Sequence, residues 1–91
     1  MTQTVAQQVV VHGRVQGVFF RDSTRQEALS RGVDGWVRNC PDGTVQAHFE
    51  GSGEAVDRMV RWCREGPSSA DVADVRVSEV APEGREGFAI R

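Results

Sequence analysis

The chain contains no lysine and no tyrosine, so all 11 of its basic side chains other than histidine are arginine. The absence of lysine excludes a Schiff-base lysine and a Walker-type phosphate loop, and the absence of tyrosine excludes a tyrosine acid. There is also no apolar run of about 18 residues that could span a bilayer. Residues 1–8 lack the basic and then apolar segments of a signal peptide. We therefore expect a cytoplasmic protein that has no membrane partner.

Cysteine is scarce as well, since the chain has only Cys40 and Cys63. These two residues form no C-x-x-C pair and are too few for a zinc cluster. Thiols in a cytoplasmic protein are normally reduced. We therefore expect both cysteines to be free, semi-buried and apolar in character.

The net charge of −2 is unevenly distributed along the chain. Residues 12–38 carry an excess of arginine over acidic residues, whereas residues 39–91 carry an excess of acidic residues. Nucleic-acid binding needs a broad basic surface, so the overall acidic balance argues against a nucleic-acid partner. The local surplus of arginine in the first half is better suited to a small anionic ligand.

The pattern of apolar and turn residues predicts a single domain over residues 1–91, with a flexible tail at residues 1–5. Helices are expected at residues 22–31 and 54–65, and strands at residues 7–13, 33–40, 44–50, 72–80 and 88–90. The order β-α-β-β-α-β plus a short C-terminal strand predicts an α+β ferredoxin-like sandwich, an antiparallel sheet with two helices on one face. Metal chaperones, RNA-binding modules and enzymes share this fold, so the site must decide the function.

The first predicted helix has signals at both ends. Residues 23–26 and 24–27 each have the Ser/Thr-x-x-Glu/Gln form of a capping box. Gly32 stands where a left-handed C-terminal cap is expected. The apolar stripe of this helix is thin, so we expect the helix to contact the sheet through Phe19 or Phe20.

Apolar and polar residues alternate over residues 44–50, which predicts a strand with one buried and one solvent-facing side. The apolar positions are Val45, Ala47 and Phe49, and the polar positions are Thr44, Gln46, His48 and Glu50. On the open side, His48 could meet His12 of the neighbouring strand. No third ligand accompanies the two histidines, so we predict no metal site.

A glycine-bearing loop, residues 13–21, joins the first strand to the first helix. Backbone N–H groups can converge on an anion in such a loop. Arg21 then stands at the mouth of the loop with a planar fork of donors suited to a phosphoryl group. A cation at a helix N-terminus opposes the helix dipole, and an anion bound between the two explains the position better. The loop therefore predicts a phosphate site built without a metal.

Two motifs, residues 11–21 (Val-His-Gly-Arg-Val-Gln-Gly-Val-Phe-Phe-Arg) and residues 35–45 (Gly-Trp-Val-Arg-Asn-x-x-Asp-Gly-x-Val), resemble the first and second signatures of the acylphosphatases. Residues 66–72 and 88–91 are similar to later landmarks of that family. The resemblance implies hydrolysis of acyl phosphates to a carboxylate and inorganic phosphate, without a cofactor. It also implies a small-molecule substrate and inorganic phosphate as product and inhibitor, and we expect a monomer.

The resemblance further implies the role of each site residue. Arg21 binds the phosphoryl group and Asn39 orients the attacking water. Backbone amides of the loop cradle the phosphoryl oxygens, and the residues concerned are Arg14, Val15, Gln16, Gly17, Val18 and Phe19. The chain departs from the family pattern at Phe19 and Ala47, where glycine is common, and the first departure bears on substrate preference.

These roles also make chemical sense. An acyl phosphate already has a good leaving group, so the protein has only to neutralise the phosphoryl oxygens and place a water in line. The amide of Asn39 can orient a water but has no useful pKa for a general base. We therefore expect an oxygen of the substrate's own phosphate to accept the proton.

Other interpretations of these residues stay open at this stage. Asn39 could serve only an Asx turn, and Arg14 and Arg38 could form an electrostatic rim. A module that binds a phosphorylated ligand without turnover is a second function class, disfavoured by Asn39. A domain of a larger maturation enzyme is a third, disfavoured by a chain that ends at Arg91 without zinc or nucleotide motifs.

Overall fold

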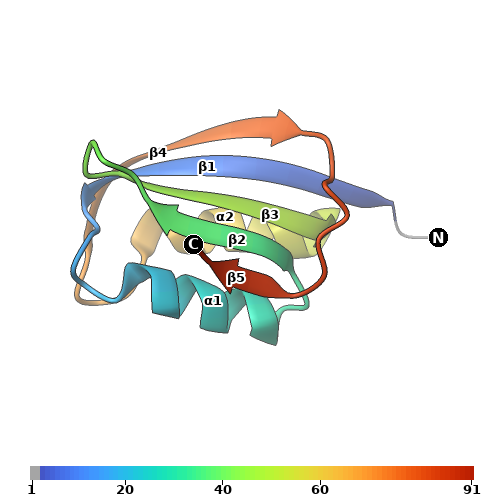
Figure 1. Ribbon diagram of the computed structural model, residues 1–91, viewed down its shortest axis with the longest axis horizontal. Coiled ribbons are helices and arrows are strands. Elements are labelled where there is room, and N and C mark those ends of the chain that lie inside the picture. The colour runs from blue at the N-terminus through green and yellow to red at the C-terminus, as the bar shows by residue number, and fades with distance from the viewer. Residues whose placement is uncertain (1–2) are drawn as a thin grey trace.

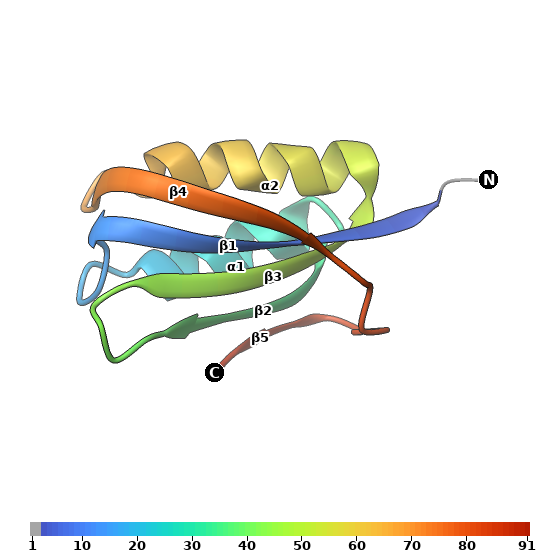
Figure 2. The same ribbon diagram turned by 90° about the horizontal axis from the view of Figure 1, so that it is seen from above.

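A computed structural model describes residues 3–91 and contains the predicted elements in the predicted order. The elements are β1 (Thr4–Arg14), α1 (Phe20–Ser30), β2 (Asp34–Asn39), β3 (Val45–Ser52), α2 (Gly53–Glu65), β4 (Asp71–Val80) and β5 (Phe88–Ile90). Both helices lie on one face of the sheet (Figures 1 and 2). The ferredoxin-like α+β sandwich expected from the sequence is therefore confirmed.

The five strands form one sheet in the order β4-β1-β3-β2-β5. The four long strands pair antiparallel, as expected, but β5 pairs parallel with β2, so the sheet is mixed and not wholly antiparallel. The reason lies in the connection after β4, which crosses one end of the sheet and returns along the edge of β2 (Figure 2). Because the chain turns back in this way, β5 runs opposite to β4. β2 also runs opposite to β4, so β5 and β2 are parallel.

The strand β1 begins earlier than the sequence suggested. It starts at Thr4, which pairs with Ser52 of β3, and continues to Arg14. The predicted tail over residues 1–5 is therefore wrong for residues 4 and 5, while residues 1–2 lie outside the described residues.

The helix α1 also begins earlier than expected, at Phe20, so neither predicted capping box lies at its start. Thr24 instead uses its hydroxyl to donate a 2.7 Å hydrogen bond to the Phe20 carbonyl within the helix. The C-terminal signal is confirmed, because Gly32 has φ +67°. The backbone N–H of Val33 donates to the Ala28 carbonyl at 2.9 Å, which completes a Schellman-type helix end.

The core lies between the sheet and the two helices. β1 and β3 contribute Val9, Val11, Val45, Ala47 and Phe49, and α2 contributes Val56, Met59, Val60 and Cys63. From α1, Phe20 is buried and its ring lies 5.6 Å from the ring of Trp62. Of the two residues predicted to anchor α1, Phe20 is buried in the core and Phe19 is 75% exposed, and the ring contact of Phe20 is with α2.

The opposite face of the sheet is not open along its whole length. His48 and Glu50, predicted to face solvent, are buried, because residues 81–87 cross over them before β5. Trp36 stacks on His48 with ring centroids 5.8 Å apart. The backbone N–H groups of Glu83 and Arg85 both donate to the Glu50 carboxylate. A charged residue can be buried here because the crossing segment supplies its hydrogen bonds.

His12 does not meet His48. The residue of β1 that pairs with His48 is Gln8, and its side-chain amide lies 3.3 Å from the ring of His48. Within residues 3–91 no group of three or more His, Cys, Asp or Glu side chains gathers in a way that could hold a metal ion. No helix among these residues has the length and apolar character needed to cross a membrane.

Both cysteines are free, as expected from the sequence. Cys40 is partly exposed, and Cys63, a residue of α2, is fully buried in the core. Burial raises the pKa of the Cys63 thiol to about 12, against a small opposing effect of Arg64. Cys63 is therefore an apolar core residue at neutral pH.

Candidate active site

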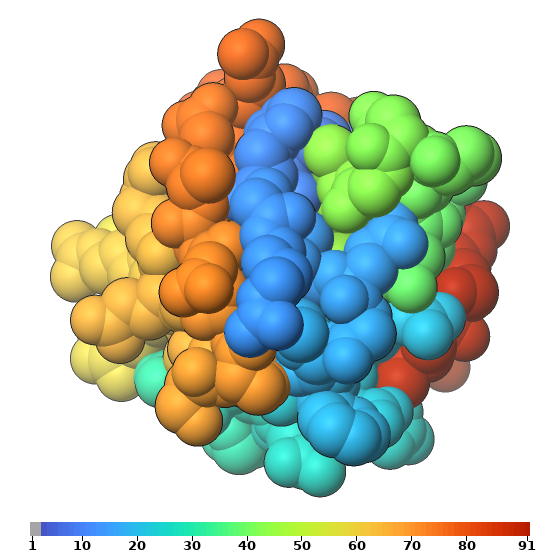
Figure 3. Space-filling model, turned by 90° about the vertical axis from the view of Figure 1, so that its left-hand side faces the viewer, coloured from blue at the N-terminus to red at the C-terminus, as the bar shows by residue number. Residues whose placement is uncertain are grey.

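A pocket of about 330 Å³ opens at one end of the sheet, where the loop after β1, the start of α1 and the ends of β2 and β5 meet. Figure 3 shows this end of the molecule. The pocket is lined by Val15, Gly17, Phe19, Phe20, Arg21, Asp22, Asn39 and Ile90. The two residues predicted to carry the chemistry, Arg21 and Asn39, thus share one pocket, although 18 positions separate their numbers in the sequence.

The backbone of the loop turns sharply just before α1. Gly17 has φ +73°, and Phe19, the N-cap residue of α1, has φ 61° and ψ 23° in the left-handed region. Within the described residues, no side chain caps the start of α1. The first backbone N–H groups of a helix have no partner within the helix, so an uncapped start leaves donors for an anion.

The loop is held in place from two sides. The side-chain amide of Gln16 donates to the carbonyls of Cys40 at 2.8 Å and Thr44 at 2.9 Å, which ties the loop to the turn between β2 and β3. The hydroxyl of Ser69 donates to the Val18 carbonyl at 2.6 Å, which ties it to the segment before β4. The sequence assigned Gln16 only a backbone role and did not single out Ser69, since both contacts depend on tertiary structure.

Arg21 lies in the first turn of α1 and is half-buried. Among residues 3–91, no carboxylate forms an ion pair with it, although most other arginines have such a partner or a hydrogen bond. Its charge also opposes the positive end of the helix dipole. Arg21 therefore brings an unpaired positive charge to the pocket, beside the carboxylate of Asp22, which also lines it.

Asn39 is the last residue of β2, and its side-chain oxygen Oδ1 is buried. This oxygen has no hydrogen-bond partner, and it is the one such buried side-chain atom in the described part of the chain. Buried polar atoms are nearly always hydrogen-bonded, so an exception calls for an explanation. Asn39 lines the pocket, so its amide lies beside the space that a bound molecule would fill, while Oδ1 itself is closed to solvent in this structure.

The alternative role of Asn39 as a turn residue is filled by Asp42. Asp42 Oδ1 accepts hydrogen bonds from the Thr44 hydroxyl at 2.6 Å and from the Thr44 backbone N–H at 3.0 Å. The Thr44 hydroxyl and then the Thr44 amide lower the pKa of this carboxyl. The turn between β2 and β3 is thus stabilised without Asn39.

Only some of the remaining predicted residues line the pocket. The guanidinium of Arg14 donates to the Ser69 carbonyl at 3.2 Å and lies 3.7 Å from the carboxylate of Asp71. The side chain of Arg38 donates to Gln46 at 2.9 Å on the other face of the sheet. Val18, a residue of the loop, has a buried side chain. The pocket lining itself includes Val15, Gly17 and Phe19 of the predicted loop residues, but not Arg14, Gln16 or Val18.

Comparison with known proteins agrees with the motifs. Residues 7–90 match the family described as Acylphosphatase. The acylphosphatase of Rubrobacter xylanophilus is 59% identical over 90 residues, which cover 98% of this chain and 82% of that protein.

Solved structures give the same result. An acylphosphatase from Coxiella burnetii superposes with a TM-score of 0.94 at 36% identity, with complete coverage of both chains. Full-length HypF in its phosphate- and nucleotide-bound form superposes with a TM-score of 0.92 at 28% identity, but this chain covers only 12% of it. Matches of this extent and identity show that the chain belongs to the acylphosphatase family, whose members hydrolyse acyl phosphates.

Proposed function

We propose that this acylphosphatase binds the phosphoryl group of its substrate with Arg21 and the backbone N–H groups of residues 14–19, and that Asn39 positions the attacking water. The observation that carries the proposal is the unpartnered, buried Oδ1 of Asn39 in the same pocket as the unpaired Arg21. An acceptor without a donor is suited to hold one hydrogen of a water, and a cation without an anion is suited to hold a phosphoryl group.

The reaction needs few groups. Water attacks the phosphorus atom, the bond between phosphorus and the bridging oxygen breaks, and the acyl group leaves as a carboxylate. The leaving group is stable as an anion, so no general acid is required. The proton of the water passes to an oxygen of the transferred phosphate, because Asn39 has no basic atom. The protein contributes positioning and charge stabilisation.

The loop supplies fixed donors at low cost. Gln16 and Ser69 hold its backbone in place before substrate arrives, so the N–H groups need little rearrangement during the reaction. Arg21 adds a planar, permanently charged fork that can contact two phosphoryl oxygens at once. Inorganic phosphate has the same oxygens, so we infer that the product competes with the substrate for this pocket.

We also propose that the enzyme needs no metal ion, acts as a monomer and hydrolyses small acyl phosphates. Its test is release of inorganic phosphate from benzoyl phosphate in metal-free buffer with excess chelator. Turnover should persist, and loss of turnover that a divalent ion restores would overturn the proposed mechanism. The same assay tests the role of Arg21, since Arg21→Ala should abolish turnover. Arg64→Gln, an exposed arginine of α2 outside the pocket, is the matched control and should keep full activity.

Binding without turnover is the competing function class, and the same material distinguishes it. Phosphate and sulfate should raise the melting temperature because they bind only the folded chain. A ligand at 100 times its Kd adds about 2.7 kcal/mol to the free energy of unfolding. A protein that is stabilised by phosphate yet releases none from benzoyl phosphate would be a binding module.

A further inference from the structure

The mouth of the pocket carries exposed apolar side chains. The exposed large hydrophobic residues of the described chain are Phe19, Leu29, Val77 and Ile90. Two of these four, Phe19 and Ile90, line the pocket that contains Arg21 and Asn39. They come from distant parts of the sequence, the start of α1 and the last strand β5, so the fold brings them together at this one opening.

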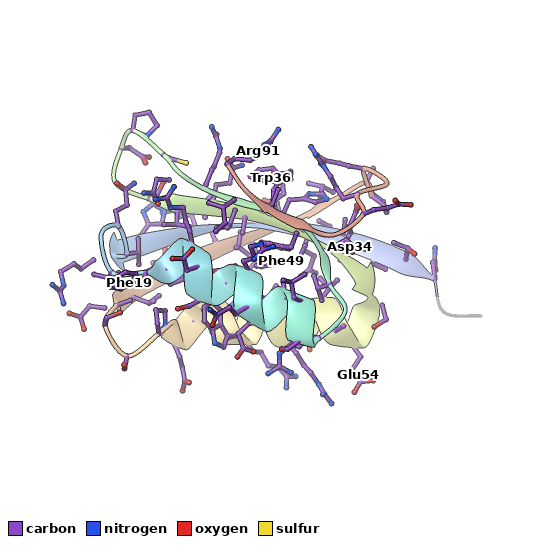
Figure 4. The ribbon with its side chains drawn as sticks, turned by 60° about the horizontal axis from the view of Figure 1, so that its bottom comes forward. Phe19, Asp34, Trp36, Phe49, Glu54 and Arg91 are labelled. Atoms are coloured by element: carbon purple, nitrogen blue, oxygen red, sulfur yellow. The ribbon has the colours of Figure 1, made fainter. Side chains whose placement is uncertain are left out.

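Phe19 has a backbone conformation that its own side chain disfavours. It is the one residue other than glycine with a positive φ among residues 3–91, and its left-handed backbone is unfavourable for a bulky side chain. The residue is 75% exposed, so burial of the side chain does not offset the strain. Strained residues that persist without a packing reason gather at functional sites. Phe19 lies where the loop meets α1, apart from the Trp36 and Arg91 side chains that lie together over the sheet (Figure 4).

The chemistry of the reaction directs the acyl group toward these side chains. In an in-line attack the water and the leaving carboxylate lie on opposite sides of phosphorus. In the proposed mechanism the water lies at Asn39, whose Oδ1 is buried, so the acyl group extends away from Asn39 toward the mouth of the pocket. The groups exposed there are the ring of Phe19 and the side chain of Ile90.

The charge at the mouth also restricts the acyl group. Asp22, an exposed residue in the first turn of α1, lines the same pocket. Its carboxylate repels an acyl group that carries a negative charge of its own, whereas it has little effect on an uncharged one.

We propose that Phe19 and Ile90 form an apolar subsite for the acyl group, and that this enzyme prefers acyl phosphates whose acyl group is bulky, uncharged and apolar or aromatic. The proposal rests on the proposed function, because it takes the phosphoryl position from Arg21 and Asn39. Aromatic contacts at partly exposed sites correspond to roughly 2- to 10-fold in an equilibrium or a rate.

The experiment compares kcat/KM for benzoyl phosphate, acetyl phosphate and succinyl phosphate. The unmodified enzyme should prefer benzoyl phosphate and use succinyl phosphate least well. Phe19→Gly removes the ring and suits the left-handed backbone, so the chain should still fold. This variant should lower the ratio of kcat/KM for benzoyl over acetyl phosphate roughly 2- to 10-fold.

Two further variants make the result specific. Ile90→Ala should lower the same ratio without a change in the loop. Leu29→Ala removes an exposed apolar side chain from α1 outside the pocket and should leave all three rates unchanged. If Phe19→Gly changed kcat/KM equally for benzoyl and acetyl phosphate, the proposed subsite would be overturned and the proposed function would stand. An unmodified enzyme that binds no phosphate and hydrolyses none of the three substrates would overturn the proposed function, and the subsite with it.

Discussion

The side-chain amide of Gln16 lies 2.8 Å from the carbonyl oxygen of Cys40, the residue that follows Asn39. The same amide contacts the Thr44 carbonyl at 2.9 Å, so one side chain of the loop spans the turn between β2 and β3. Under the proposed mechanism this contact connects the two halves of the reaction, because the loop holds the phosphoryl group and the end of β2 holds the water. The distance between phosphorus and water then depends on a residue that touches neither.

Gln16→Met keeps the length of the side chain and removes both hydrogen bonds. The two carbonyls keep backbone donors, from Gly43 and Cys40, so the free energy of unfolding should fall by only about 1–2 kcal/mol. The rate should fall further, roughly 10- to 100-fold in kcat, because small misplacements of reacting groups are costly. Steady-state kinetics and chemical denaturation measure the two effects. Gln46→Met, on the other face of the sheet, is the control, and an unchanged kcat for Gln16→Met would leave the contact a structural one.

How much the sequence could predict depended on how local each signal was. The apolar alternation over residues 44–50 predicted a strand but not that Glu50 is buried, because the covering segment, residues 81–87, is polar and lies more than 30 positions away. The loop motif identified Arg21 and the second family motif identified Asn39, and the structure brings the two residues into one pocket. It did not reveal the unpartnered oxygen of Asn39, because hydrogen-bond partners depend on packing.

The start of α1 shows the opposite error, in which local signals were misleading. Two capping boxes favoured a start near residue 22, yet the helix starts at Phe20. The left-handed Phe19 turns the chain into the helix earlier, at a conformation that glycine or asparagine would normally adopt. A phenylalanine at this position gave no sign of the turn. Its strain is visible only in the structure.

The two thiols should differ sharply in reactivity. Burial raises the pKa of Cys63 to about 12, so almost none of it is thiolate at neutral pH, whereas Cys40 is partly exposed. Native protein should react with one equivalent of Ellman's reagent, and denatured protein with two. Cys40→Ser should abolish the native reaction. Two equivalents of rapid reaction in the native state would contradict the burial of Cys63.

The Glu50 carboxylate should stabilise the fold only above acidic pH. Burial raises its pKa, but hydrogen bonds from the Glu83 amide, the His48 ring and the Arg85 amide outweigh burial, and the net pKa lies below the usual 4.5. A lowered pKa in the folded state means that the stabilisation is present above about pH 4.5 and is lost as pH falls through the folded value. The segment before β5 should therefore loosen first in acid.

Glu50→Gln tests this directly. The neutral amide replaces one acceptor oxygen with a donor that faces backbone N–H groups, so we expect a loss of about 1–3 kcal/mol at pH 7. The loss should shrink as pH falls through the folded-state pKa of Glu50, below 4.5, where the unmodified chain also loses its carboxylate. Urea denaturation at several pH values measures both, with Glu79→Gln on exposed β4 as the control. The pKa of Asp42 is lowered as well, but its titration is the same in both proteins and cancels in the difference. The pKa of Glu83 is also lowered, and because its backbone N–H binds the Glu50 carboxylate, its titration contributes to the difference.

The sharpest prediction separates Arg21 from Asn39. Arg21 is proposed to contact the phosphoryl group in both the ground state and the transition state. Arg21→Ala should therefore abolish phosphate binding and turnover together. Arg21→Lys should fail badly as well, because a single ammonium cannot reproduce the planar fork.

Asn39 is assigned to the water alone, so Asn39→Ala should lower kcat while phosphate affinity stays within a few-fold of the parent. The loss of one oriented hydrogen bond in a transition state corresponds to about 2.7–4 kcal/mol, or roughly 10²–10³ in rate. Asn39→Asp adds a second test, since a carboxylate there would repel the phosphoryl group and weaken phosphate binding, which the alanine variant does not. Calorimetry of phosphate binding beside single-turnover rates distinguishes the Asn39 variants from the Arg21 variants. Normal turnover by Asn39→Ala would mean that the unpartnered oxygen does not hold the water, and the attacking molecule would have to be positioned by the loop amides instead.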